Sequence, residues 1–331
     1  MKAILYPARG RVDLTELPDP RPKAGEVVIA MRASGICHTD IEVLHGNYGS
    51  SAFPLVPGHE YAGEVAEVGP GVTGFSVGDR VVVDPNLECG HCRACRRGWA
   101  HLCENLGAYG VTVNGGFAQF STVRADRVHA IGDLPFHVAA LAEPMGCVLN
   151  GVAAARGETA ESALIFGAGP IGLLMAIALA TLGVRDISLV DPDETRLALA
   201  ESFGFAPIAA GGAALRGMRH AVDLAVDATG NPAVAATLTD HVANGGTGLF
   251  FGVCPSVARI EIAPFELFRR QITLAGSHSL NHNIPEALAA IRAYGPGIER
   301  LISHRLPLDE VAKVLAGARL SGSLKIQAVE A

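Results

Sequence analysis

Four cysteines are gathered in one short segment of the chain. The run CGHCRACRRGWAHLC places Cys89, Cys92, Cys95 and Cys103 in a C-x2-C-x2-C-x7-C pattern. Four thiolates around a tetrahedral ion leave no open coordination position, so a zinc ion held in this way is structural. The total of seven cysteines is odd and four are clustered, which favours metal ligation over a disulfide framework.

Two other metal-binding modules share features of this pattern. An iron–sulfur cluster is the main alternative, and a nucleic-acid zinc module is the second. The formal net charge of −7 argues against any nucleic-acid partner, which would require a basic face. His91 and His101 are substitute ligands by residue type, but with four cysteines present we interpret both as surface residues.

A second set of possible metal ligands is scattered along the chain. Cys37 lies in GICHTD, His59 and Glu60 follow in PGHEYAG, and Glu143 precedes a proline in LAEPMG. A thiolate, an imidazole and a carboxylate can close three corners of a tetrahedron and leave one for water or substrate, which is a catalytic zinc arrangement. Each residue also has an ordinary interpretation, as a buried thiol, a loop histidine or a solvated acid. The spacing alone leaves both interpretations open.

A glycine-rich turn lies near the middle of the chain. In GAGPIG, the residues Gly167, Gly169 and Gly172 have the G-x-G-x-x-G spacing, with Pro170 and Ile171 before the last glycine. The turn follows a predicted strand and opens a predicted helix, which is the context of a dinucleotide-binding fingerprint. The glycines let the backbone approach a pyrophosphate, and the helix N-terminus favours its charge. A glycine turn in a nucleotide-free domain is the alternative.

The acid that follows this turn bears on the choice of cofactor. Asp191 ends a predicted strand, 19 residues after Gly172. It can accept hydrogen bonds from the adenosine ribose and would repel a 2′-phosphate, so it favours NAD over NADP. Arg196 is a possible phosphate ligand, but we expect it to face solvent or the adenine edge. A solvated strand-end acid is the alternative interpretation of Asp191.

The elements that would position these residues fall into two regions. Residues 1 to about 135 contain β-rich runs such as EVVIAMRASGI, YAGEVAEVG and DRVVVDP, punctuated by glycine and proline. From about residue 160, strands such as SALIFGAG and DISLVD alternate with helices, which predicts a doubly wound parallel sheet. Two helices, near 285–294 and 308–317, and a strand in SLKIQAVE close the chain. The fold class is α/β with a β-rich first part.

Membrane insertion and export are not expected. Ala163 to Val184 carries no charge, but Gly167, Gly169, Pro170 and Gly172 divide it into a short strand and a helix. The first residues read as a strand rather than as a cationic leader with an apolar region. We therefore expect a cytoplasmic protein.

Together these motifs make the chain resemble the zinc-containing medium-chain alcohol dehydrogenase superfamily. The polyol (sorbitol, galactitol) and threonine dehydrogenase branch is the most similar. GICHTD, PGHEYAGEV, VGDRVVV, the four-cysteine loop, GGFAQF, the Glu-Pro pair at 143–144, GAGPIG and GSLKIQ carry the resemblance over essentially the whole length. It implies a GroES-like catalytic domain over 1–146 with a structural zinc loop at 88–104. A Rossmann NAD-binding domain over 147–282 would follow, and residues 283–331 would return to the first domain. The active site would lie between the domains.

The resemblance also implies roles for the scattered ligands. Cys37 and His59 would hold the catalytic zinc, with Glu60 and Glu143 as its carboxylates, either of which could ligate directly. Many alcohol dehydrogenases have a cysteine at the position of Glu143, so the carboxylate favours the polyol branch. Cys147, one turn further on, is a less favoured substitute.

Residues beside Cys37 would transfer the substrate proton and bind the cofactor. Thr39 would bind the substrate oxygen and pass its proton outward, and His38 would face the cofactor pyrophosphate. Many relatives carry a histidine where this chain has Glu42, so we expect Glu42 to take over the relay, with His45 as the other exit.

The function expected is hydride transfer between a secondary alcohol or polyol and NAD, with two zinc ions per chain. L-threonine 3-dehydrogenase and primary alcohol dehydrogenase are the alternatives within this chemistry. A non-catalytic, NAD-binding zinc scaffold is the alternative outside it. The family implies a homo-oligomer, either a dimer or a tetramer, with a small-molecule substrate.

Overall fold

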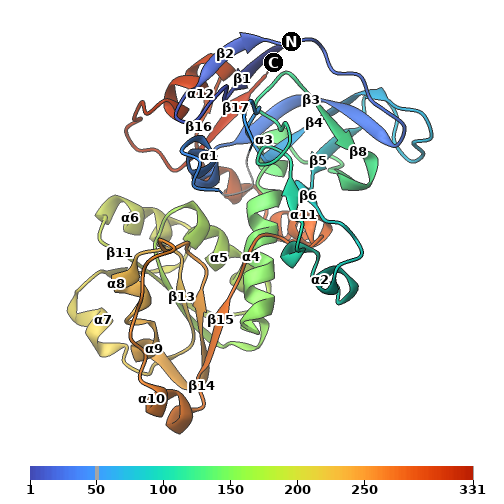
Figure 1. Ribbon diagram of the computed structural model, residues 1–331. Helices are drawn as coiled ribbons and strands as arrows, with labels where there is room; N and C mark the ends of the chain where they lie inside the picture. Colours follow the sequence, from blue (N-terminus) through green and yellow to red (C-terminus); the bar gives the residue numbers. More distant parts are fainter. Residues whose placement is uncertain (49–51, 331) are drawn as a thin grey trace. The chain divides into compact units, whose positions relative to one another are not determined.

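The computed structural model describes residues 1–48 and 52–330. Its contacts divide the chain into two compact units, Met1–Glu143 with Ile284–Ala331, and Pro144–Asn283 (Figure 1). The sequence predicts boundaries at 146/147 and 282/283, within three residues of these.

The first unit is built on a seven-stranded sheet with the strand order β16-β17-β3-β4-β5-β9, and β8 also pairs with β3. The central strand β3 is mostly apolar, and seven of its ten residues are buried. The elements of this unit are β1 (Lys2–Leu5), β2 (Asp13–Glu16), β3 (Glu26–Gly35), α1 (His38–Leu44), β4 (Glu60–Val68), β5 (Arg80–Val83), β6 (Asn86–Leu87), α2 (Arg93–Arg96), η1 (Ala100–Leu102), β7 (Gly107–Ala108), β8 (Phe120–Arg124), η2 (Ala125–Arg127), β9 (Val128–Ala130), α3 (Phe136–Ala139), α11 (Ile284–Tyr294), η4 (Pro296–Leu301), β16 (Ile302–Leu306), α12 (Leu308–Leu315) and β17 (Lys325–Val329).

The C-terminal strand is part of this first sheet. β17 pairs antiparallel with β3, with Gln327 opposite Gly35, and parallel with β16. On α12, Leu308, Val311 and Leu315 are buried at helical spacing and join the core that contains Ile4 and Met31. The last part of the chain therefore completes the unit that the first part begins.

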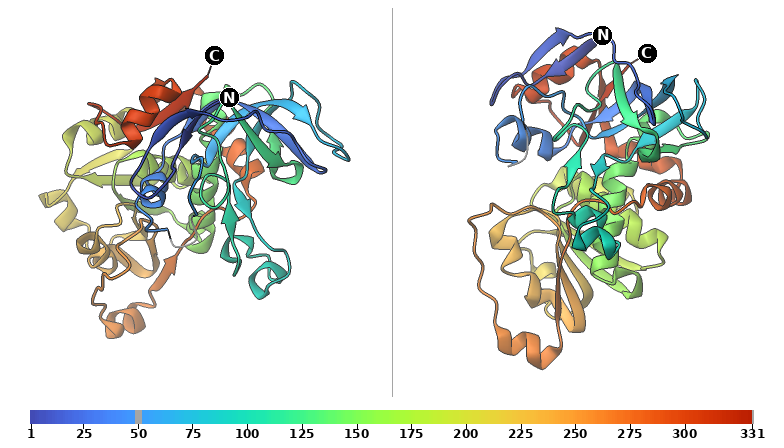
Figure 2. Two further views of the ribbon diagram at one scale, coloured as in Figure 1. Left: turned by 45° about the horizontal axis from the view of Figure 1, so that its top comes forward. Right: turned by 45° about the vertical axis from the view of Figure 1, so that its right-hand side comes forward.

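The second unit is a six-stranded parallel sheet in the order β12-β11-β10-β13-β14-β15. From β10 the chain adds β11 and β12 toward one edge of the sheet, and from β13 it adds β14 and β15 toward the other edge. Because parallel crossovers are right-handed, the two halves place their helices on opposite faces, as the views of Figure 2 show. The elements are α4 (Ala142–Ala154), which begins in the first unit, η3 (Gly157–Thr159), β10 (Ser162–Phe166), α5 (Pro170–Thr181), β11 (Asp186–Asp191), α6 (Glu194–Ser202), β12 (Ala206–Ala209), α7 (Ala213–Gly217), β13 (Val222–Asp227), α8 (Pro232–Ala235), α9 (Leu238–His241), β14 (Val242–Phe250), α10 (Pro264–Arg270) and β15 (Thr273–Gly276).

The fold class predicted from the sequence is confirmed. The uncharged stretch from Ala163 to Val184 forms strand β10 and helix α5, and most of α5 is buried. Pro170 occupies the first turn of that helix, where its missing N–H costs nothing. Within the described residues, only the stretch Phe136–Ala154, which comprises α3 and α4, is helical, long and apolar enough to cross a membrane. Of its most apolar 18 residues, 67% are buried inside the protein, as in a core helix.

Candidate metal and cofactor sites

The strand pairing of the first unit brings three of the predicted ligands together. Cys37 follows the end of β3, while His59 and Glu60 lie at the start of β4, where Glu60 is opposite Gly35 in the ladder. One ligand atom from each of Cys37, His59 and Glu60 lies within 4.8 Å of the other two. Soft sulfur, imidazole nitrogen and carboxylate oxygen form the donor set of a zinc site with an open position. These residues fit the ion that the sequence predicts.

The carboxylate of Asp40 orders this group and was not recognised as a site residue from the sequence. Its Oδ2 accepts a hydrogen bond from the Cys37 amide at 2.8 Å, and its Oδ1 accepts one from the Gly58 amide at 3.2 Å. Oδ1 also lies 3.4 Å from Nδ1 of His59. A carboxylate beside Nδ1 favours the tautomer that carries its hydrogen there and leaves Nε2 for the metal, although the two atoms are not aligned for a hydrogen bond in this structure.

Two neighbouring groups, Asp40 and Cys37, affect the protonation of His59. Burial alone would lower its pKa, but Asp40 and Cys37 outweigh burial and raise the pKa well above the ordinary value. A metal that binds Nε2 must displace this proton, so metal binding and proton release are coupled.

Replacing Asp40 with asparagine is expected to weaken metal binding at Cys37 by about 10- to 100-fold, because the amide removes the negative charge behind His59. The measurement is competition with a chelator. Asp126→Asn is the matched control, because Asp126 is paired with Arg124 at an exposed position of the same unit. Equal metal affinity in the Asp40 variant and the wild type would show that Asp40 only caps the helix.

Within the part of the chain that the structure describes, the fourth predicted ligand, Glu143, is not in the same close group as the other three. Glu143 is buried in the first turn of α4. A second unrecognised residue, Lys325 on β17, forms a salt bridge with Glu60. Its only sequence signal is the lysine in GSLKIQ, which by itself suggests a surface residue.

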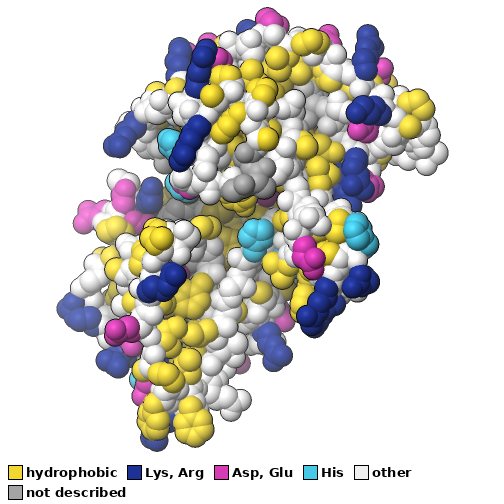
Figure 3. Space-filling view, in the orientation of Figure 1, with side chains coloured by type: hydrophobic (Ala, Val, Ile, Leu, Met, Phe, Trp, Pro, Cys, Tyr) yellow, Lys and Arg dark blue, Asp and Glu magenta, His cyan; other side chains and the backbone are white. Residues whose placement is uncertain are grey.

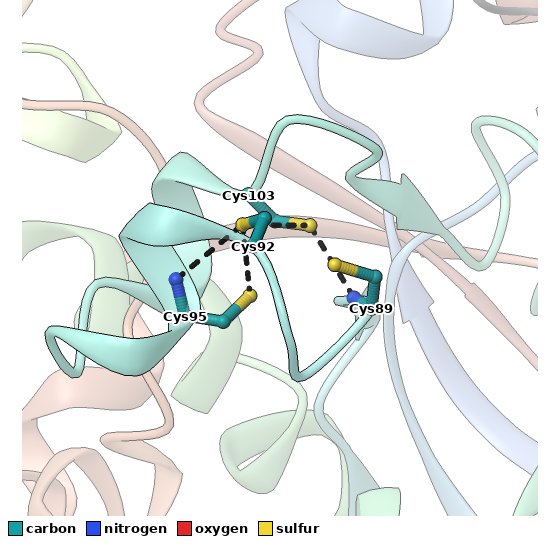
Figure 4. A group of neighbouring side chains, drawn as sticks. All are labelled: Cys89, Cys92, Cys95 and Cys103. Carbon is teal, nitrogen blue, oxygen red and sulfur yellow. Dashed lines mark hydrogen bonds between the residues drawn. The ribbon is translucent and has the colours of Figure 1, made fainter.

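The four-cysteine segment forms a closed cluster (Figure 4). The sulfur of Cys92 lies 3.4 Å from that of Cys95 and 4.0 Å from that of Cys103, and all four sulfur atoms lie within 4.8 Å of one another. The Cys95 backbone N–H and other backbone donors lower the pKa of Cys92 to about 6, so a thiolate is favoured there. This all-sulfur arrangement fits a structural zinc ion and leaves no place for a substrate.

The two histidines of this segment differ in exposure. His91 is exposed, as predicted. The prediction that His101 is also a surface residue is wrong, because η1 turns it inward and it is only 8% exposed. Neither belongs to the four-sulfur group.

The residues of α1 beside Cys37 show how the relay could be arranged. Thr39 is half-buried, whereas the His38 side chain is 79% exposed. Oε1 of Glu42 lies 3.3 Å from Nε2 of His38, and its Oε2 accepts a hydrogen bond from Asn47. Thr39 and Glu42 are three residues apart on one helix and therefore lie on the same face.

The glycine turn in the second unit has no side chains at its three glycines, as a dinucleotide-binding fingerprint requires for close approach of the backbone. Gly167 has φ +102°, and a Cβ on Gly172 would lie 1.7 Å from the Gly167 carbonyl oxygen. Pro170 and Ile171 begin α5 directly after Gly169. The turn therefore packs the helix against the strand so closely that only glycine fits.

Asp191 lies at the end of β11 and is buried rather than solvated. Its Oδ2 accepts a hydrogen bond from the Ala168 amide inside the glycine turn at 2.8 Å, and its Oδ1 accepts one from the Asp193 amide at 2.9 Å. Each carboxylate oxygen keeps a second lone pair that a ribose hydroxyl can use. Nη1 of Arg196 lies 3.9 Å from this carboxylate, and the arginine side chain is 46% exposed.

A parallel sheet with a dinucleotide turn, combined with a β-rich unit that carries two ligand groups, defines a class of zinc- and nicotinamide-dependent dehydrogenases. Two family models match the chain: an alcohol dehydrogenase GroES-like domain over residues 23–133, and a zinc-binding dehydrogenase over residues 170–293.

Individual proteins extend this similarity over nearly the whole chain. D-altritol 5-dehydrogenase of Agrobacterium fabrum strain C58 is 54% identical over 315 residues, which is 94% of each chain. D-arabinitol dehydrogenase 1 of Uromyces fabae is 30% identical over 98% of this chain and 96% of its own. A zinc-binding dehydrogenase of Sinorhizobium meliloti 1021, solved with NADP, is 29% identical and superposes with a TM-score of 0.95 over 99% of each chain. The chain therefore belongs to the zinc-binding dehydrogenase family, and it is an alcohol or polyol oxidoreductase that uses a nicotinamide cofactor.

Proposed function

We propose that this enzyme oxidises a secondary hydroxyl of an open-chain polyol with NAD, and that zinc at Cys37 and His59 is required. The grouping of Cys37, His59 and Glu60 at the junction of β3 and β4 carries the proposal, because it provides an open metal site. The 54% identity to a D-altritol 5-dehydrogenase supports a polyol as the substrate.

When bound, zinc would supply Lewis acidity toward the substrate hydroxyl, and NAD would supply the hydride acceptor. The residues of the chain supply positioning and proton transfer. Cys37 and His59 hold the metal, with a carboxylate from Glu60 or Glu143 beside it. The Thr39 hydroxyl takes the substrate hydroxyl proton as it passes its own proton on to Glu42. Oε1 of Glu42 lies 3.3 Å from Nε2 of His38 on the exposed side of α1. The family resemblance assigns His38 to the cofactor pyrophosphate, and His45 is the other exit for the proton.

The second unit holds the dinucleotide. The turn from Gly167 to Gly172 receives the pyrophosphate at the start of α5, and Asp191 accepts the adenosine ribose hydroxyls. A 2′-phosphate would meet the buried Asp191 carboxylate, which is why we propose NAD although a similar structure contains NADP. Arg196, whose Nη1 lies 3.9 Å from this carboxylate, is the cation that an NADP-specific site would use for the 2′-phosphate.

Replacing Asp191 with alanine is expected to reduce kcat/KM for NAD by about tenfold or more, because a charged hydrogen-bond acceptor is lost. The ratio of NAD to NADP activity should fall with it. Asp193→Ala is the matched control, since Asp193 caps α6 two residues away without touching the glycine turn. If the wild type already prefers NADP, the ribose argument is wrong.

Metal content and assembly complete the proposal. We expect two zinc ions per chain, one at Cys37 and one in the four-cysteine cluster. We also expect a homo-oligomer. Exposed apolar side chains on α10 support association, because Phe265 is 64% and Phe268 is 81% exposed there (Figure 3). Light scattering in solution measures the assembly directly.

One experiment tests the function as a whole. The purified protein is analysed for zinc, and NAD reduction is followed with D-altritol, other polyols, simple primary and secondary alcohols, and L-threonine. Two zinc ions with fastest turnover on polyols support the proposal. Fastest turnover on threonine or a primary alcohol would identify one of the alternative dehydrogenases. One zinc ion and NAD binding without turnover would identify a scaffold protein.

A further inference from the structure

A buried lysine lies beside the proposed metal ligands. The Lys325 side chain is 7% exposed and that of Glu60 is 1% exposed, and the ammonium contacts Oε2 of Glu60. The same ammonium donates a hydrogen bond to the Ile36 carbonyl oxygen at 3.0 Å. A lysine is rarely buried to this extent without a specific ionic partner, so the pair has to be explained.

The backbone is shaped to admit this pair. β17 and β4 both flank β3, so Lys325 and Glu60 reach the end of β3 from its two sides. A Cβ on Gly35 would lie 2.1 Å from Oε2 of Glu60 and 3.0 Å from Cε of Lys325. Only glycine at this point of β3 leaves room for both side chains.

Several negatively charged groups act on the Lys325 ammonium. Glu60 contacts it directly, and Cys37 and Glu143 also attract it electrostatically. Together with Asp40 behind His59, these groups contribute four negative charges when ionised. Lys325 and a divalent metal ion contribute three positive charges, so the formal charge is −1 with the lysine and −2 without it. Without the lysine, the metal would stand among a larger excess of negative charge, which weakens its pull on a substrate oxygen.

We infer that Lys325 is a positioning residue that holds and neutralises Glu60, so that the metal at Cys37 and His59 keeps its electrophilic character and its open position. This inference rests on the proposed zinc site. It assigns to a residue 289 positions from Ile36 a role in the chemistry of the first ligand segment. If Lys325 is removed, Glu60 is released toward the metal.

The test is Lys325→Met, with cobalt(II) exchanged for zinc at Cys37 while the four-cysteine cluster keeps zinc. We expect kcat to fall about 10- to 100-fold with KM changed less, as for other residues behind metal ligands. We expect the metal to be retained, with release to a chelator no faster than in the wild type. The cobalt absorption spectrum should change, because the carboxylate environment of the ion changes.

Two further variants keep the test decisive. Lys325→Arg should restore most of the turnover, because it returns the charge. Lys325→Met combined with Glu60→Gln should be less impaired than Lys325→Met alone, because it removes both charges. Lys313→Met is the matched control, since Lys313 is 62% exposed and pairs with Glu310 in the same unit.

Three outcomes would overturn the inference. An unchanged cobalt spectrum with unchanged kcat would show that the lysine does not act on the site. Loss of the metal in Lys325→Met would show that it only supports the fold, as would failure of Lys325→Arg to restore turnover. A wild-type protein that turns over without metal at Cys37 would instead refute the proposed function itself.

Discussion

Replacing Cys37 with serine is expected to abolish turnover while NAD still binds. Cys37 is the only sulfur in the close group with His59 and Glu60. A hydroxyl is a much poorer zinc ligand than a thiolate, so the metal should be lost from this group. Lewis-acid assistance is worth several kcal/mol, and about 4 kcal/mol corresponds to a thousandfold in rate. We therefore expect kcat to fall by about three orders of magnitude or more.

The measurement combines zinc analysis, NAD binding by fluorescence titration and turnover on the best polyol. Cys147→Ser is the matched control, because Cys147 is another half-buried cysteine and lies one turn beyond Glu143 on α4. One zinc ion should be lost from the Cys37 variant and none from the control. Unchanged activity in Cys37→Ser would eliminate the catalytic zinc assignment, and loss of activity only in Cys147→Ser would move the ligand to α4.

Replacing Cys95 with alanine should reduce stability much more than turnover, the opposite of the effect expected for Cys37. The four cysteines hold a segment whose only regular structures are the short helices α2 and η1. Metal ligation in small sites is worth on the order of 10 kcal/mol, so the segment should lose its order when the ion leaves. A loss of about 3 kcal/mol in the free energy of unfolding lowers Tm by about 10 °C for a domain of this size. Turnover per folded molecule at low temperature should change much less.

Thermal unfolding and zinc analysis measure this effect, with Cys254→Ala as the control because Cys254 lies outside both ligand groups. The Cys95 and Cys37 variants should each lack one zinc ion, but only the Cys95 variant should be less stable. A Cys95 variant that is stable and lacks only activity would reverse the roles of the two metal sites.

The predicted elements agree with the structure where their sequence signals are local. The strand, glycine turn and helix around Gly167 form β10 and α5, because apolar runs and glycine spacing act over a few residues. The four-cysteine cluster is local in the same sense, since all its ligands lie within 15 residues. The inward position of His101 was missed, because a single turn of helix decides which side of a short loop is buried.

The sequence by itself determined the family, the fold class and the identity of the candidate ligands. Those properties depend on residue types and on short spacings, which can be read from the sequence without knowledge of the fold. Tertiary structure alone decided which carboxylate lies close to Cys37 and what surrounds it. Asp40 behind His59 and Lys325 against Glu60 are set by the register of β17, β3 and β4. The physical reason is that a strand shifted by one residue turns every side chain to the other face, and no local signal encodes that register.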